Sequence, residues 1–306
     1  MTAVIDLQPE RIEAAVELID PLFRNTPQFV EPRLAAALAR HVVVKVETLN
    51  PIGSFKARGA SVLARRLHAE RTWVCVTGGN FGQGLAYLAR ERGAAVDAFV
   101  SPRVPSFKVD RLRDLGARVE VHEDAEGAAR EHAAASDERL LVVDGRDPAM
   151  AEGAGTIGVE LAALDPFETV VVQVGDGALI TGVACWLKHV APQTRIVGVC
   201  ASGAPAMAHS FAAGRVVAAP GDGTVATALA ITEPVPESLA RVMALVDEIV
   251  LVEDDDLRRA AELIADCVGV LVEPAGAAGV AALVRHGEKL PGDRAAVILT
   301  GAGARL

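Results

Sequence analysis

The sequence predicts an α/β protein built on parallel β-sheets. Short apolar or β-branched segments alternate with Ala/Leu/Arg-rich segments of helical period along nearly the whole chain of 306 residues. Several strand segments are apolar throughout rather than alternating, as expected of strands that are covered on both faces. Strands and helices in strict alternation form right-handed βαβ units, whose strands run parallel.

The expected elements can be placed along the chain from this alternation. Segments with strand composition are residues 41–47, 73–76, 95–100, 117–121, 140–143, 169–174, 195–200, 248–252 and 295–300. Segments with helical period are residues 57–69, 82–92, 105–115, 124–138, 178–190 and 254–268. No internal repeat marks a domain boundary, and the Pro/Gly-bearing loops 144–153 and 217–224 are the best break points.

The composition excludes several classes of function. A formal net charge of −10 without a long basic run argues against a nucleic-acid partner. Asp6 and Glu10 interrupt the start where a signal peptide would be apolar, and Glu273-Pro274 interrupts the most membrane-like stretch. The cysteines lack CxxC spacing and the histidines lack HExxH spacing, so we expect reduced thiols in a cytoplasmic protein without a metal site.

The first Gly-rich loop, residues 48–60, follows the strand 41–47 and carries a lysine. Pro51 and Gly53 predict a tight turn, after which Lys56 opens a helix. Backbone N–H groups at a helix start disfavour the ammonium form of a lysine and attract phosphate. Such an amine suits imine formation with an aldehyde cofactor, whereas the alternative is a solvated surface lysine.

The second loop, residues 77–86, follows the strand 73–76. Its glycines expose consecutive N–H groups at a helix N-terminus, which predicts an anion site fit for a carboxylate. Asn80 is the residue there that lies between glycines and has a side chain able to donate a hydrogen bond. The alternative is an ordinary turn with Asn80 as a helix cap.

The third loop, residues 173–182, follows the strand 169–174 and has two interpretations. Gly175 and Gly177 begin a dinucleotide-binding fingerprint. However, Ile180 stands at the third glycine position, and the next strand ends without the acid that would hold a ribose. A site for a single phosphate therefore fits better than one for a pyrophosphate.

Taken together, six motifs in order resemble the threonine dehydratase, serine racemase and threonine synthase group of pyridoxal-phosphate enzymes, called fold type II. They are KVETLNPIGSFKARGA, TGGNFGQG, GRDPAMAEGAGTIGVEL, QVGDGAL, VEPAGAAG and VILTGAG. The resemblance implies a tryptophan synthase β-like fold of two open, twisted, mostly parallel sheets flanked by helices. It also implies a large domain of residues 1–70 plus 146–306, a small mobile domain of residues 71–145, and a homodimer.

The resemblance implies a role for each matching position. Lys56 would form the Schiff base with pyridoxal 5′-phosphate and move the proton at the substrate α-carbon. Phe55 would pack on the cofactor ring, Asn80 would bind its 3′-oxygen, and Thr300 would lie at the pyridine nitrogen. The residues implied to bind the phosphate are Gly175, Asp176, Gly177, Ala178 and Leu179. The residues implied to bind the substrate carboxylate are Thr77, Gly78, Gly79, Asn80 and Phe81.

Several positions depart from the pattern of that group. Phe81 stands where dehydratases commonly carry histidine, and Gly78 stands where serine racemases have a catalytic serine. Racemisation is therefore disfavoured. Cys200 and Ala201 stand where metal-activated members have a glutamate, so no divalent cation is expected.

Asp176 is a further departure, because the group usually has glycine there. A carboxylate beside a phosphate dianion is unfavourable unless one of them binds a proton. One hypothesis is that Asp176 raises the proton affinity of the phosphate, which then donates to a leaving hydroxyl. The alternative is a side chain directed outward into water.

These observations favour a lyase that acts by α,β-elimination on a small β-hydroxy L-amino acid such as threonine or serine, to give a 2-oxo acid and ammonia. A hydroxyl at position 300 cannot keep a pyridine nitrogen protonated, which favours prompt loss of a β-leaving group. Alternatives are β-replacement or threonine synthase-like chemistry, a nucleotide-binding oxidoreductase, and a binding protein without catalysis.

Overall fold

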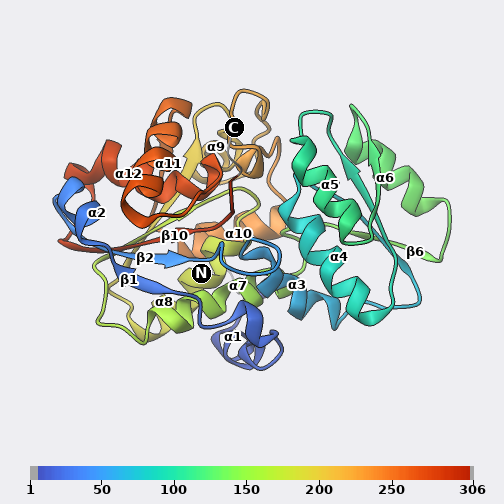
Figure 1. Ribbon diagram of the computed structural model, residues 1–306, viewed down its shortest axis with the longest axis horizontal. Helices are drawn as coiled ribbons and strands as arrows, with labels where there is room; N and C mark the ends of the chain where they lie inside the picture. Colours follow the sequence, from blue (N-terminus) through green and yellow to red (C-terminus); the bar gives the residue numbers. More distant parts are fainter. Residues whose placement is uncertain (1–5, 304–306) are drawn as a thin grey trace.

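The chain folds around two separate β-sheets, as the computed structural model of residues 6–303 shows (Figure 1). The larger sheet has six strands in the order β1-β2-β10-β7-β8-β9. These strands are β1 (Gln28–Val30), β2 (His41–Val46), β7 (Thr169–Gln173), β8 (Arg195–Ala201), β9 (Glu248–Val252) and β10 (Arg294–Leu299). All neighbours pair in parallel except β1, which pairs antiparallel with β2.

The smaller sheet has four parallel strands in the order β5-β4-β3-β6. They are β3 (Thr72–Val76), β4 (Val96–Val100), β5 (Arg118–Val121) and β6 (Arg139–Val142). The helices α4 (Asn80–Arg92), α5 (Ser106–Asp114) and α6 (Ala125–Ala134) connect these strands. Together they form the lobe on the right of Figure 1.

Alternate residues of the large sheet enter two different cores, as two-sided burial requires. Val42, Val44 and Val46 of β2 pack with the helices α2 (Pro32–Ala37), α11 (Asp254–Val268) and α12 (Ala278–His286). Val43 between them packs with α7 (Pro148–Leu161), α8 (Ala178–Val190) and α10 (Pro236–Leu245). The strands are thus covered on both faces, which explains their continuous apolar sequences.

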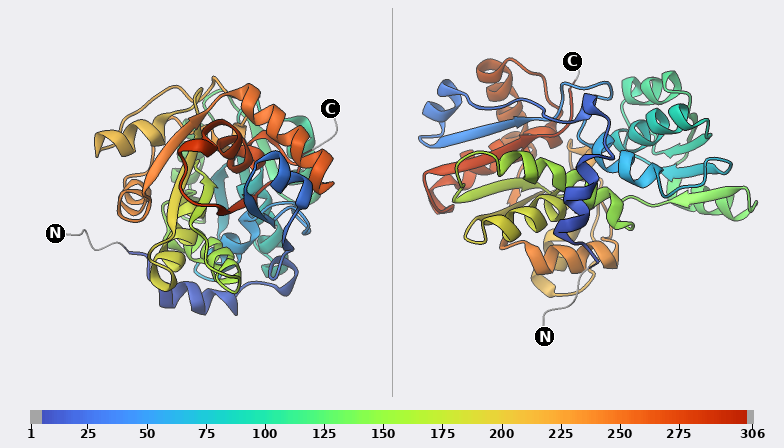
Figure 2. Two further views of the ribbon diagram at one scale, coloured as in Figure 1. Left: turned by 90° about the vertical axis from the view of Figure 1, so that its left-hand side faces the viewer. Right: turned by 90° about the horizontal axis from the view of Figure 1, so that it is seen from below.

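The remaining helices are α1 (Pro9–Val16), α3 (Lys56–Ala64) and α9 (Ala206–Ala213), with short 3₁₀ turns η1 (Pro21–Phe23), η2 (Thr227–Leu229), η3 (Pro274–Ala277) and η4 (Gly287–Lys289). The helix α1 lies at the periphery of the molecule (Figure 2), whereas every residue of α3 is buried. The helices α7 and α8 approach closely, since a Cβ at Gly182 would lie 2.0 Å from the carbonyl oxygen of Ala151. This contact requires glycine and locks the helix that follows β7 against the helix that leads back from the small sheet.

The sheets are mostly parallel, as expected, but two details differ from the expectations. The antiparallel edge strand β1 was not expected, because its few residues carry no signal. The loop proposed for residues 144–153 ends early, because Asp147 caps α7, which begins at Pro148. Proline at the first helical position suits a helix start, so its presence there did not indicate a loop.

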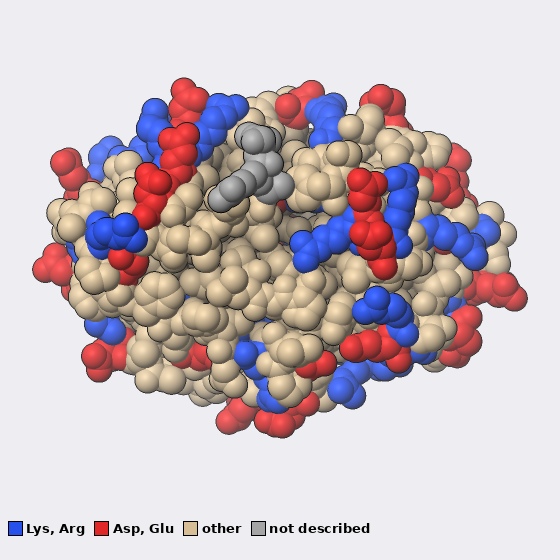
Figure 3. Space-filling model, viewed as in Figure 1, with Lys and Arg blue, Asp and Glu red and all other residues tan. Residues whose placement is uncertain are grey.

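The ends of the expected large domain, residues 1–5 and 304–306, lie outside the described part of the chain. Among residues 6–303, no helix combines the length and apolar character needed to cross a membrane. Acidic and basic side chains are interspersed over the face shown in Figure 3.

Candidate active site

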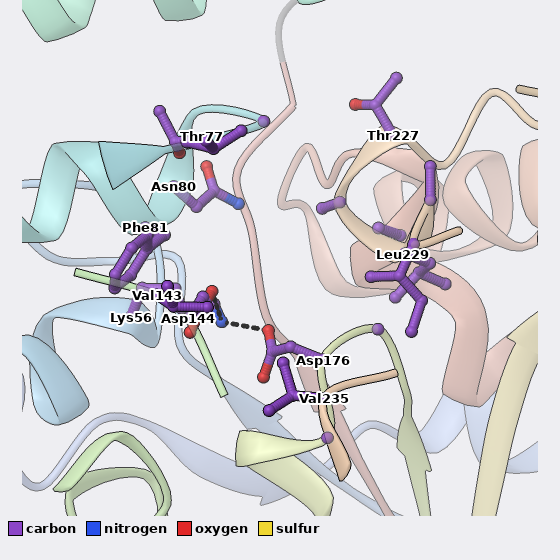
Figure 4. Close-up of a pocket in the computed structure, with 18 of the residues that line it drawn as sticks. Lys56, Thr77, Asn80, Phe81, Val143, Asp144, Asp176, Thr227, Leu229 and Val235 are labelled. Carbon is purple, nitrogen blue, oxygen red and sulfur yellow. Dashed lines mark hydrogen bonds and ion pairs between the residues drawn. The ribbon is translucent and has the colours of Figure 1, made fainter. Parts of the chain in front are cut away.

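A pocket of about 320 Å³ lies between the two sheets and receives loops from both (Figure 4). The small sheet contributes the segments after β3 and β6, and the large sheet contributes those after β7 and β10. All these segments follow the carboxyl ends of parallel strands, where ligands bind in open α/β sheets. The pocket brings together every residue proposed from the sequence except Gly79 and Ala178, which lie in the same two loops but do not line it.

Lys56 is the first residue of α3, as its sequence context predicts. A tight turn precedes it, in which the N–H of Gly53 donates to the carbonyl of Asn50 at 2.9 Å and Gly53 adopts a φ of 62°. The N–H of Phe55 donates to the carbonyl of Thr300 at 3.1 Å. The lysine loop is therefore fastened directly to the end of β10.

The environment of the Lys56 amine is acidic. Its Nζ donates to Oδ2 of Asp144 at 2.6 Å and to Oδ2 of Asp176 at 2.6 Å. Burial alone would lower the pKa of Lys56, but the charges of Asp144 and Asp176 outweigh it and raise that pKa above its ordinary value. The expectation that the helix start disfavours the ammonium form is thus wrong for this arrangement, because two carboxylates neutralise the local field.

The two carboxylates differ in their surroundings. Burial, followed by the charge of Asp176, raises the pKa of Asp144 to about 7. Burial acts in the same direction on Asp176, but Lys56 and the N–H of Ala178 overcome it and hold the pKa of Asp176 below its usual value. Asp176 faces the pocket rather than bulk water, since its side chain is 20% exposed and contacts Lys56.

The loop after β3 turns sharply at Gly79, whose φ of 123° suits glycine. The hydroxyl oxygen of Thr77 accepts from the N–H groups of Gly79 at 2.9 Å and Gly82 at 3.0 Å, which fixes the loop. Gly79 is the residue that precedes α4, so the interpretation of Asn80 as a helix cap is wrong. The N-terminus of α4 is thereby presented to the pocket with its first N–H groups lacking helical acceptors.

Asn80 is held by a buried ion pair that joins the two sheet units. Its Nδ2 donates to Oε1 of Glu273 at 2.7 Å, and Nζ of Lys108 contacts the other oxygen of Glu273. Lys108 and Glu273 are 3% and 9% exposed. Neither residue was predicted as a site residue from the sequence. Glu273 lies within the motif VEPAGAAG, but no sequence pattern links it to a lysine on α5.

The loop after β7 has the geometry of an anion site. Gly177 has a φ of 93° and precedes α8. A Cβ at Gly175 would lie 2.8 Å from the carbonyl oxygen of Ala228, and one at Gly177 would lie 2.5 Å from Oγ of Ser238. Only glycines fit in these positions, and the helix N-terminus beyond them can bind a phosphate through backbone N–H groups.

Thr300 is oriented by Gln173 at the floor of the pocket. Nε2 of Gln173 donates to Oγ1 of Thr300 at 2.6 Å and to the carbonyl of Ile298 at 3.0 Å. The carbonyl can only accept, so the amide orientation is fixed. The hydroxyl proton of Thr300 is consequently free to donate to an acceptor in the pocket.

A buried charge cluster anchors the helix that carries Lys56. The guanidinium of Arg58 donates to both carboxylate oxygens of Glu47 at 2.8 Å and to Oε1 of Glu160 at 2.6 Å. Lys45 pairs with the second oxygen of Glu160. Arg58 and Glu47 have no exposed side-chain surface. The cluster fixes the start of α3 relative to β2 and α7.

One wall of the pocket was not predicted from the sequence. Residues 227–235, which include η2, line the side opposite the loop 77–81, and Figure 4 shows Thr227 and Leu229 there. Asp144 was placed in a loop but given no role, since a single aspartate after a strand carries no specific signal. Among residues 6–303, no cluster of His, Cys, Asp and Glu side chains could hold a metal ion.

A buried lysine beside a glycine-lined helix N-terminus, at the meeting of two mostly parallel sheets, is the arrangement expected of an enzyme with an aldehyde cofactor that carries a phosphate. Residues 19–301 match the family described as pyridoxal-phosphate dependent enzyme, and the chain belongs to this family. Its cofactor is pyridoxal 5′-phosphate. The space at Gly175 and Gly177, the buried amine of Lys56 and the hydroxyl of Thr300 are compatible with this group, which has a phosphate, an aldehyde and a ring nitrogen.

Relatives indicate the branch of the family. The chain is 30% identical over 299 residues to L-threonine ammonia-lyase of Thermotoga maritima, covering 95% of this chain and 74% of that protein. It is 31% identical to L-threonine ammonia-lyase of Geobacter sulfurreducens, covering 90% and 70%. The solved threonine deaminase from T.th. superposes with a TM-score of 0.87 at 28% identity, covering 98% and 99% of the chains. Maize serine racemase gives a TM-score of 0.90 at 25% identity, covering 98% and 94%. These structures confirm the expected fold type.

Proposed function

We propose that this protein is an ammonia-lyase that eliminates water from a small β-hydroxy L-amino acid, giving a 2-oxo acid and ammonia. The observation that carries the proposal is the position of Lys56, which lies between the phosphate loop and the loop 77–81. The relatives named L-threonine ammonia-lyase support the same reaction. L-Threonine and L-serine are the first substrates to test.

The pocket residues have different proposed roles in the reaction. Pyridoxal phosphate, when bound, accepts the electron pair that is left on the α-carbon when the α-proton is removed. Lys56 would bind the cofactor aldehyde and, once the substrate amine has taken its place there, its free amine would accept the α-proton. N–H groups of the loop 175–179 would hold the phosphate, although that of Ala178 donates to Oδ1 of Asp176 in this structure. Phe55 would cover the ring, and Asn80 would bind the 3′-oxygen.

The substrate carboxylate is proposed to bind in the loop 77–81 at the N-terminus of α4, on the N–H groups of Gly78, Asn80 and Phe81. The N–H groups of Thr77 and Gly79 donate to the carbonyl of Phe99 and the hydroxyl of Thr77 and thereby shape the loop. Phe81 adds an apolar surface, and its ring centroid lies 5.9 Å from Nζ of Lys56. Phe81 therefore favours a β-carbon substituent without charge. Because Gly78 has no side chain, no base lies on it to exchange the α-proton from the opposite face, which favours elimination over racemisation.

The organisation around the site extends the proposal. Residues 71–145, which contain the small sheet, are proposed to form a mobile domain against residues 1–70 and 146–306. We further propose a homodimer in the cytoplasm. The four cysteines are unpaired, as is usual in a reducing compartment.

The test is a screen of L-amino acids against purified holoprotein. Formation of 2-oxo acid and ammonia from threonine or serine, together with its loss in Lys56→Ala, is the expected result. Lys289→Ala on the exposed turn η4 is the matched control and should keep full activity. Product that appears only when a second nucleophile is added would instead establish β-replacement, and turnover of neither amino acid would refute the proposal.

A further inference from the structure

Asp144 is a pocket residue to which the proposed reaction has so far given no part. We propose that Asp144 is the acid that protonates the leaving β-hydroxyl of the substrate. The proposal rests on the elimination reaction given above and names the group that completes it. It also assigns a source for the proton, which is the amine of Lys56.

The position of Asp144 places it beside the substrate site. Strands β3 and β6 are parallel neighbours, with Cys75 opposite Val142. Thr77 and Asp144 each follow two residues later, so both lie beyond the carboxyl ends of adjacent strands. A substrate whose carboxylate binds the loop 77–81 therefore has its α- and β-carbons within reach of both Asp144 and Lys56.

The contacts of Asp144 leave it free to carry a proton. Its Oδ2 lies 2.6 Å from Nζ of Lys56. Its Oδ1 is buried and has no hydrogen-bond partner within residues 6–303. An unpaired buried carboxylate oxygen is unfavourable, and a substrate hydroxyl at this point would satisfy it.

Asp176 is not suited to the same task. Its Oδ1 accepts from the N–H of Ala178 at 2.8 Å, and its Oδ2 is held by Lys56. The charged groups facing Asp144 are Lys56 and Asp176, with the buried thiol of Cys75 behind it. The pKa of Asp176 lies below its usual value, and its negative charge raises the pKa of Asp144.

The proton balance closes without any further reactant. Lys56 takes the α-proton and becomes an ammonium ion. It passes a proton across the 2.6 Å contact to Asp144. Asp144 gives this proton to the β-oxygen as the carbon–oxygen bond breaks, and water leaves. Both side chains return to their starting protonation states, and general acid catalysis of this kind contributes about 10²–10⁴-fold.

A substrate pair separates this role from a structural one. Departure of hydroxide from L-serine requires a proton, whereas departure of chloride from β-chloro-L-alanine does not. In Asp144→Asn, elimination from L-serine should fall by about 10²–10⁴-fold, while elimination from β-chloro-L-alanine falls less than roughly tenfold. Asp144→Glu should recover part of the serine activity. Asp137→Asn, an exposed change in the turn before β6, is the matched control and should leave both rates unchanged.

Readouts other than turnover complete the test. The visible absorbance of the bound cofactor should persist in Asp144→Asn. When the cofactor-free proteins are titrated around pH 7, Asp144→Asn should release about one proton fewer than wild type. Equal losses with both substrates, or loss of the cofactor, would show that Asp144 only positions Lys56 and would overturn the proposal. If wild type eliminates chloride but not water, the proposed function fails instead.

Discussion

Replacement of Arg58 by methionine should destabilise the protein by about 3–5 kcal/mol, the usual effect of breaking a buried ion pair. Arg58 and Glu47 are both 0% exposed, and Glu160 is 13% exposed. Without Arg58, the cluster holds two carboxylates and one ammonium, that of Lys45. Glu47 keeps one hydrogen bond, from Oγ1 of Thr26 at 2.5 Å. Most of the desolvation of Glu47 is then uncompensated.

The assay is urea unfolding followed by far-UV circular dichroism, with the cofactor removed. The double variant Arg58→Met/Glu47→Gln should recover part of the loss, since the unpaired charge is gone. Arg113→Ala is the control, because its pair with Asp110 is exposed, and it should change stability by less than about 0.5 kcal/mol. A loss below about 1 kcal/mol in Arg58→Met would refute the reasoning that this cluster anchors α3.

Three further outcomes are expected. Gly182→Ala should lower the free energy of unfolding in urea by about 1–3 kcal/mol, because the added Cβ would meet the backbone of α7. Gly287→Ala is the control and should be neutral, since no neighbouring atom among residues 6–303 is found within 4 Å of its added Cβ. Equal effects of the two substitutions would contradict the close packing of α7 and α8. Burial raises the pKa of Cys200 to about 12, so iodoacetamide at neutral pH should leave this thiol unmodified in the native protein, while the less buried Cys267 reacts. Mass spectrometry of the labelled peptides is the measurement, and label on Cys200 but not on Cys267 would contradict the expectation. The pKa of Asp144 is about 7 in the folded protein, against an ordinary value of 3.8. Between pH 3.8 and about 7 the folded state therefore binds a proton on Asp144 that the unfolded state has lost, so the free energy of unfolding falls as the pH rises through this range. Melting temperatures of the cofactor-free protein over this range should fall less steeply in Asp144→Asn, and identical slopes would contradict the raised pKa.

The predictable part of the fold is the part set by local patterns. Continuous apolar segments identified the parallel strands, and α3 begins at Lys56 as predicted because the turn at Gly53 precedes it. The edge strand β1 was missed because three residues at the rim of a sheet carry no periodic signal. The helix α7 (Pro148–Leu161) was not among the expected helices, because its capping Asp147 and its first residue Pro148 resemble loop residues.

The site was predictable where glycine was required. Gly79, Gly175 and Gly177 stand where positive φ values or close backbone contacts leave no room for a Cβ, and such positions are visible in a sequence. Asp144 and Glu273 were not, because their importance comes from partners far along the chain. The expectation that Lys56 disfavours its ammonium form was wrong for the same reason. It considered only the N–H groups at the start of the helix, whereas the tertiary fold also brings two carboxylates to the amine.

The most direct test of the central claim is to locate the bond between protein and cofactor. Purified holoprotein is reduced with borohydride and digested, and its lysine peptides are analysed by mass spectrometry. We expect a phosphopyridoxyl group on Lys56. Its presence on Lys45 or Lys108 instead, or on no lysine, would contradict this expectation.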